Sequence, residues 1–144
     1  MAASLLWTVF PANANVTSSG LLIEDNGVDL STDTAESRAV VTRNETAIIA
    51  MLSATRGSYV GMPPARSVSL AFRGVSKLPR SVMVGAARLP ALSSPPAALG
   101  EQGFALLSSE QGAPEGPLVL PPATLLVALG SVKLCDETKV TVVW

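Results

Sequence analysis

Turn-forming residues interrupt this sequence so often that no long segment with helical periodicity remains. In residues 67–73, Val68, Leu70 and Phe72 alternate with small or polar residues, which is the period-two pattern of a strand with one buried face. Asp25-Asn26-Gly27 is a strong turn signal, since Asn and Gly tolerate a positive φ at little cost. Short segments separated by such turns predict an all-β fold, an antiparallel β-sandwich of about eight short strands.

The predicted strands and loops make up a single domain, residues 1–144, which is an ordinary length for one domain. Strands are expected at residues 5–10, 16–24, 38–42, 46–52, 67–73, 81–84, 103–107, 124–129 and 139–144, and residues 38–52 are expected to form a β-hairpin. A further apolar run covers residues 118–120. Residues 29–36 and 53–64 are expected to be loops, and the Pro-rich residues 89–116 an irregular insertion.

Composition excludes several classes of function. The chain has no histidine and one cysteine, Cys135, so it cannot form a Ser-His-Asp or Cys-His catalytic arrangement, a Cys/His zinc site or an internal disulfide by itself. Its 10 basic and 11 acidic residues give a net charge of −1, without a basic surface for nucleic acid or a polybasic membrane segment. We therefore expect no nucleic-acid partner, no membrane, no metal and no cofactor.

Three motifs stand in order along the first half of the chain. Residues 6–11 form an apolar strand closed by an aromatic residue and a proline; Glu24, Asp25, Asn26 and Gly27 form an acidic turn after Leu22-Ile23; and the third motif contains Gly57, Tyr59, Gly61, Met62, Pro63 and Arg66. Together they resemble the distal C-terminal β-sandwich domain of glycoside hydrolase family 31 (GH31), the α-glucosidase and α-xylosidase family. The second motif is similar to that domain's Leu-Tyr-Glu-Asp-Asp-Gly turn, and the third to its Gly-x-Tyr-x-Gly-Met-Pro-x-x-Arg loop.

The resemblance is strongest over residues 5–84 and departs in detail: Ile23 stands where the family usually has Tyr, and Leu30 where it has an aromatic residue. It implies a parent enzyme that hydrolyses O-glycosyl bonds, with two catalytic aspartates on a (β/α)8 barrel that precedes this domain. A chain of 144 residues is too short to contain a barrel of about 250 residues. The resemblance therefore implies a non-catalytic accessory domain or fragment, whose partner is the barrel that it packs against and stabilises.

The residues themselves leave a second interpretation open, a free-standing carbohydrate-binding or protein-interaction module. Tyr59 could stack on a sugar, but a single tyrosine in a chain with 4% aromatic residues favours packing over the sandwich edge. Gly57 and Gly61 are expected to supply special φ values, and Arg66 to pair with a carboxylate or a carbonyl that pins the loop. We interpret the ten residues of the second and third motifs as structural rather than catalytic.

Two further features bear on function. Glu24, Asp25, Asp29 and Asp33 could suggest a glycosidase carboxylate pair or a Ca²⁺ loop, but the EF-hand spacing is missing and acidic turn residues on a solvated loop are the simpler interpretation. The Asp25 side chain is expected to accept hydrogen bonds from backbone N–H groups two residues later in the chain. Asn15-Val16-Thr17 and Asn44-Glu45-Thr46 are N-glycosylation sequons, which matter if the chain passes through the secretory pathway. The compartment itself is not defined by the sequence.

Overall fold

The computed structural model describes residues 4–11, 15–28, 33–94, 101–107 and 123–144. These residues form strands and connecting loops, and they include no helix long and apolar enough to cross a membrane. The strands are β1 (Ser4–Val9), β2 (Thr17–Glu24), β3 (Ala35–Arg43), β4 (Ala47–Leu52), β5 (Arg56–Gly57), β6 (Ala65–Arg73), β7 (Ser81–Val84), β8 (Ala87–Arg88), β9 (Gln102–Leu107), β10 (Thr124–Lys133) and β11 (Thr138–Val143).

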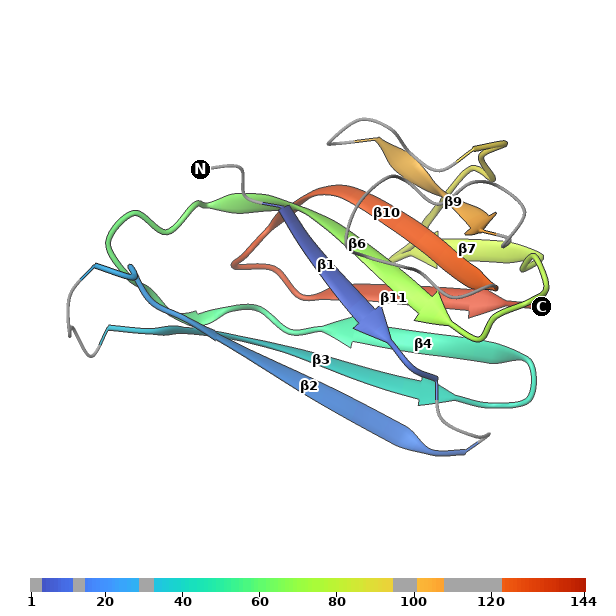
Figure 1. Ribbon diagram of the computed structural model, residues 1–144, viewed down its shortest axis with the longest axis horizontal. Coiled ribbons are helices and arrows are strands. Elements are labelled where there is room, and N and C mark those ends of the chain that lie inside the picture. The colour runs from blue at the N-terminus through green and yellow to red at the C-terminus, as the bar shows by residue number, and fades with distance from the viewer. Residues whose placement is uncertain (1–3, 12–14, 29–32, 95–100, 108–122) are drawn as a thin grey trace.

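Two sheets pack face to face, as Figure 1 shows. The four-stranded sheet has the order β1-β6-β10-β9, and the seven-stranded sheet has the order β2-β3-β4-β11-β7-β8, with β5 paired to β3. Because the chain passes repeatedly from one sheet to the other, β6 is adjacent to β1 and β10, which are far from it in sequence. The predicted β-sandwich is confirmed.

The core lies between the sheets and follows the strand period of two. In β6, Val68, Leu70 and Phe72 are buried, and they face buried residues of the opposite sheet such as Ile48 and Val142. The alternation of these residues with Ser67, Ser69 and Arg73 in the sequence therefore reflects the side of β6 that faces the core. This packing holds together strands that have few local contacts.

The structure differs from the predicted strands in several places. The predicted hairpin is confirmed as β3 and β4. However, β3 begins at Ala35, inside the expected loop, because its first residues pair with β2 and β5 although they have no apolar pattern. β10 continues to Lys133 because it pairs with the start of β6. The two-residue strands β5 and β8 were not predicted, since so short a strand leaves no periodic signal.

One strand pair also departs from the expected antiparallel arrangement. β1 pairs with β6 in parallel, with Ser4 opposite Ser67 and Val9 opposite Phe72. Within residues 89–116, the structure describes β9, and Ala91 bridges to Phe104. The expected run at residues 118–120, most of the remaining insertion and Asp29 and Leu30 lie outside the described residues.

Substitution of Leu70 tests whether this core holds the sheets together. Leu70 is fully buried and contributes to the cluster that joins both sheets, so Leu70→Ala should lower the free energy of unfolding by about 2–5 kcal/mol. Leu21→Ala is the matched control, because the Leu21 side chain is half exposed on β2, and it should cost less than about 1 kcal/mol. Urea denaturation measures both, and equal losses would contradict the assigned core.

Candidate functional site

Arg66 is buried at the end of the core, which is unusual for a charged residue. It is the second residue of β6 and in phase with Val68, Leu70 and Phe72, so its side chain points between the sheets rather than to solvent. A guanidinium in this position loses its hydration and requires polar partners. The local strand pattern thus places a charge in the interior and makes its partners structurally important.

Arg66 has two such partners from different parts of the chain. Its Nη1 lies 2.7 Å from Glu24 Oε1, and its Nη2 donates a hydrogen bond of 3.1 Å to the Tyr59 hydroxyl. Arg66 Nε is buried and has no hydrogen-bond partner among the described residues. We call Glu24, Tyr59 and Arg66 the Arg66 node. Of the two partners predicted for Arg66, a carboxylate or a carbonyl, the structure shows the carboxylate.

The node connects the two sheets. Glu24 is the last residue of β2 in the seven-stranded sheet, whereas Arg66 belongs to the four-stranded sheet. The ion pair is largely shielded from water, since 8% of the Arg66 side chain and 23% of the Glu24 side chain are exposed. Removing one partner of such a pair leaves the other charge poorly solvated, so the pair opposes separation of the sheets at this end.

The turn after Glu24 is closed by its own side chains. Gly27 N donates to Asp25 Oδ1 at 2.8 Å, and Val28 N donates to Asn26 Oδ1 at 3.1 Å. Gly27 has a φ of +66°, which glycine adopts without the steric cost of a side chain. The expected bond from the Asp25 carboxylate to an N–H two residues on is confirmed, and this carboxylate serves the turn.

The loop that carries Tyr59 is fixed at both of its glycines. Gly57 has a φ of +80° and lies against the Thr34 carbonyl, in the register that pairs Gly57 with Ala35. Met62 N donates to Tyr59 O at 3.1 Å around Gly61, whose φ is +87°, as a type II turn requires at its third position. The special φ values predicted for the two glycines are confirmed, and half-buried Tyr59 is held through its hydroxyl.

Residues of the second and third motifs therefore meet in the structure. The second and third motifs converge at the left end of the sandwich in Figure 1, where the end of β2 and residues 58–64 lie close together. Met62 and Pro63 are half-buried in that loop. Two contacts were not anticipated from the sequence, the Thr34 carbonyl against Gly57 and the bond from Leu134 N to Pro64 O at 3.1 Å. Both contacts involve backbone atoms, so the residue types in the sequence do not predict them.

The other candidate residues lie outside this node. Asp33 is exposed, and Asp29 lies outside the described residues, within which no group of three or more His, Cys, Asp or Glu side chains gathers. Both sequons lie at the opposite end of β3: Asn15 N donates to Arg43 O at 2.7 Å, and Asn44 Oδ1 accepts hydrogen bonds from the N–H groups of Thr46 and Ala47. Their glycosylation stays a prediction.

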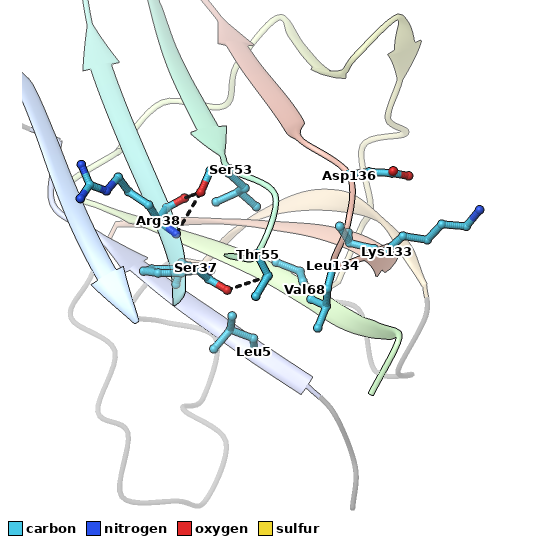
Figure 2. A pocket seen from close by; sticks show the side chains of 12 residues that line it. Leu5, Ser37, Arg38, Ser53, Thr55, Val68, Lys133, Leu134 and Asp136 are labelled. Carbon is cyan, nitrogen blue, oxygen red and sulfur yellow. Dashed lines mark hydrogen bonds between the residues drawn. The ribbon is translucent and has the colours of Figure 1, made fainter. Parts of the chain in front are cut away.

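Figure 2 shows a small cavity that Ser53 and Thr55 help to line. Its volume is about 30 Å³, and its lining includes Leu5, Val68 and Leu134. Ser37 Oγ and Thr55 Oγ1 are hydrogen bonded at 2.8 Å at its edge. A space of this size corresponds to about one water molecule and is too small for a sugar ring or a substrate.

Comparison with known proteins gives a likeness in structure rather than in sequence. No family model matches the sequence, and no curated protein matches it. Among solved structures, the GH31 dextranase of Flavobacterium johnsoniae in complex with glucose matches 98% of this chain with a TM-score of 0.70 and 14% identity. A mutant of that dextranase with isomaltotriose gives the same values. The α-1,4-glucan lyase of Gracilariopsis lemaneiformis matches 96% of this chain with a TM-score of 0.60 and 14% identity.

This chain has the fold of a GH31 β-sandwich domain. The resemblance that the three motifs predicted is thereby confirmed as a likeness of fold. The matched region makes up 17% of the dextranase chain and 13% of the lyase chain, so the GH31 β-sandwich is a small part of these enzymes. Their activities belong to the whole proteins and are not properties of this fold alone.

Substitution of the two loop glycines tests the conformation of the Tyr59 loop. A Cβ at Gly61 would meet no atom within 4 Å, so Gly61→Ala should cost only the strain of a positive φ, about 1 kcal/mol of unfolding free energy. A Cβ at Gly57 would overlap the Thr34 carbonyl oxygen, so Gly57→Ala should cost about 3 kcal/mol as β5 separates from β3. Equal losses in chemical denaturation would contradict this loop geometry.

Proposed function

We propose that this chain is the non-catalytic C-terminal accessory domain of a GH31 glycoside hydrolase, where it packs against the catalytic barrel and stabilises it. The observation that carries the proposal is the match of nearly the whole chain to a small part of two larger carbohydrate-active enzymes. The order of the three motifs along residues 5–84 supports the same parent family.

The geometry of the motif residues supports a structural role. Glu24 and Tyr59 are engaged with Arg66, and the Asp25 carboxylate accepts a hydrogen bond within its own turn. Inverting and retaining glycosidases use two carboxyl groups that flank a sugar ring, one of them as an acid. Here the paired carboxylate of Glu24 faces a guanidinium at the end of the core, where it joins two sheets.

The alternative function, a free-standing carbohydrate-binding module, depends on Tyr59 in particular. The Tyr59 ring is half-buried and its hydroxyl is hydrogen bonded to Arg66, which agrees better with packing than with an exposed sugar platform. A protein-interaction module is compatible with the accessory role, because packing on a barrel is itself a protein interface. We therefore retain the accessory domain as the primary proposal.

Activity and binding assays on the purified chain distinguish these functions. We expect no hydrolysis of 4-nitrophenyl α-glucoside above the buffer blank and no saturable binding of glucose or isomaltotriose by calorimetry. Hydrolysis that copurifies with the folded chain would contradict the non-catalytic role. Binding that is lost in Tyr59→Ala and retained in Tyr59→Phe would favour the carbohydrate-binding alternative, because the phenylalanine keeps the ring and removes only the hydroxyl.

A further inference from the structure

The charges of this chain are unevenly distributed, although its net charge is only −1. Between Glu45 and Glu101 the sequence contains no acidic residue. The basic residues of the same stretch are Arg56, Arg66, Arg73, Lys77, Arg80 and Arg88. Two of them, Arg80 and Arg88, line one groove together with residues 78–79, residues 89–91 and Phe104. We call it the Arg80 groove.

The Arg80 groove lies where the two sheets approach each other beside β7 and β9, at the right of Figure 1. Residues 78–80 form one wall, and Arg80 N donates a hydrogen bond of 2.8 Å to Val143 O at the end of β11. Residues 88–91 form the other wall, and Pro90 O accepts a hydrogen bond of 3.0 Å from Phe104 N in β9. Backbone bonds to both sheets therefore hold the two walls in place.

The floor of the groove is apolar, and its volume suits a small ligand. Leu89 and Phe104 are buried and belong to the core that joins the sheets, whereas Leu78 is 50% exposed. The volume is about 510 Å³. Pockets for small ligands typically measure about 300–1,000 Å³ and combine apolar walls with a few polar groups. Unlike the cavity in Figure 2, this groove has room for a ring-sized molecule.

The polar side chains of the groove lining are two guanidinium groups. Within the described part of the chain, neither Arg80 nor Arg88 lies at ion-pair distance from a carboxylate. Arg88 Nη2 donates a hydrogen bond of 2.9 Å to the Arg80 carbonyl oxygen, which orients the Arg88 side chain and does not neutralise its charge. A guanidinium carries five N–H donors, so this bond leaves most of the Arg88 donors for a ligand.

Two uncompensated guanidinium groups beside an apolar floor favour a ligand with an oxyanion at one end and an apolar group at the other. Guanidinium groups bind phosphate and carboxylate oxygens through charge-assisted and often bidentate hydrogen bonds. A phosphate monoester carries about −1.5 to −2 charges at pH 7. This charge matches two guanidinium groups better than the single charge of a carboxylate does.

We propose that the Arg80 groove binds a phosphate monoester of an apolar alcohol. Arg80 and Arg88 bind the phosphate, and the organic group covers Leu89 and Phe104. The bond that already orients Arg88 lowers the entropic cost of binding. This site goes beyond the accessory role and does not depend on it, because every residue invoked belongs to this chain.

Titration with phenyl phosphate tests the site in the 144-residue chain. Calorimetry gives the affinity, and backbone amide shifts in NMR spectra locate the ligand. The comparison probes are inorganic phosphate, which lacks the ring, benzoate, which carries a single charge, and phenol, which is neutral. Arg80→Gln and Arg88→Gln each remove one guanidinium. Arg56→Gln is the matched control, because Arg56 is also exposed but lies on β5, outside the groove.

We expect phenyl phosphate to bind at least about tenfold more tightly than each comparison probe and to shift the amide signals of Arg80, Leu89 and Phe104. Each groove variant should weaken this binding at least about tenfold, and Arg56→Gln should leave it unchanged. All three arginines are exposed, so the urea midpoints of the variants should equal that of the parent chain.

Three results would overturn the site and leave the accessory role standing. The first is no saturable binding of phenyl phosphate. The second is an equal loss of affinity in Arg56→Gln, because the attraction would then come from the overall charge. The third is equal affinity for inorganic phosphate or benzoate, because the apolar floor or the second guanidinium would then contribute nothing.

Discussion

The ion pair between Glu24 and Arg66 is the interaction on which this end of the sandwich depends. Arg66 is inward-facing because it shares the phase of the buried β6 residues, so its charge must be compensated inside the protein. Glu24 comes from the opposite sheet and supplies that compensation at 2.7 Å. The requirement to pair one buried charge therefore determines how the end of β2 and the start of β6 approach each other.

The two adjoining turns follow from the same requirement. Tyr59 bonds Arg66 from a loop that turns at Gly57 and again at Gly61, and both glycines have positive φ values. The Asp25–Val28 turn begins directly after Glu24 and is closed by the Asp25 and Asn26 side chains. This geometry combines glycine at two loop positions with a carboxylate, a phenol and a guanidinium at three others.

The sequence predicted the elements that a local residue pattern determines. It did not predict those that depend on pairing with strands far away in the sequence. Alternation in residues 67–73 predicted β6, and Asn-Gly predicted the turn with its positive φ. The parallel pairing of β1 with β6, the two-residue β5 and the early start of β3 depend on backbone bonds to remote segments, which carry no residue code. The sequence predicted that Arg66 pairs with a carboxylate or a carbonyl, but the identity of the partner as Glu24 required the relative placement of the two sheets.

A double-mutant cycle between Glu24 and Arg66 tests the central claim most directly. The free energies of unfolding of the parent chain, Glu24→Gln, Arg66→Met and the double variant are measured by urea denaturation. If the ion pair joins the sheets as described, the coupling energy between the two substitutions should be about 2 kcal/mol. The double variant should then lose less free energy of unfolding than the two single variants lose together. Additivity within about 0.5 kcal/mol would show that the two residues act independently and would contradict the account.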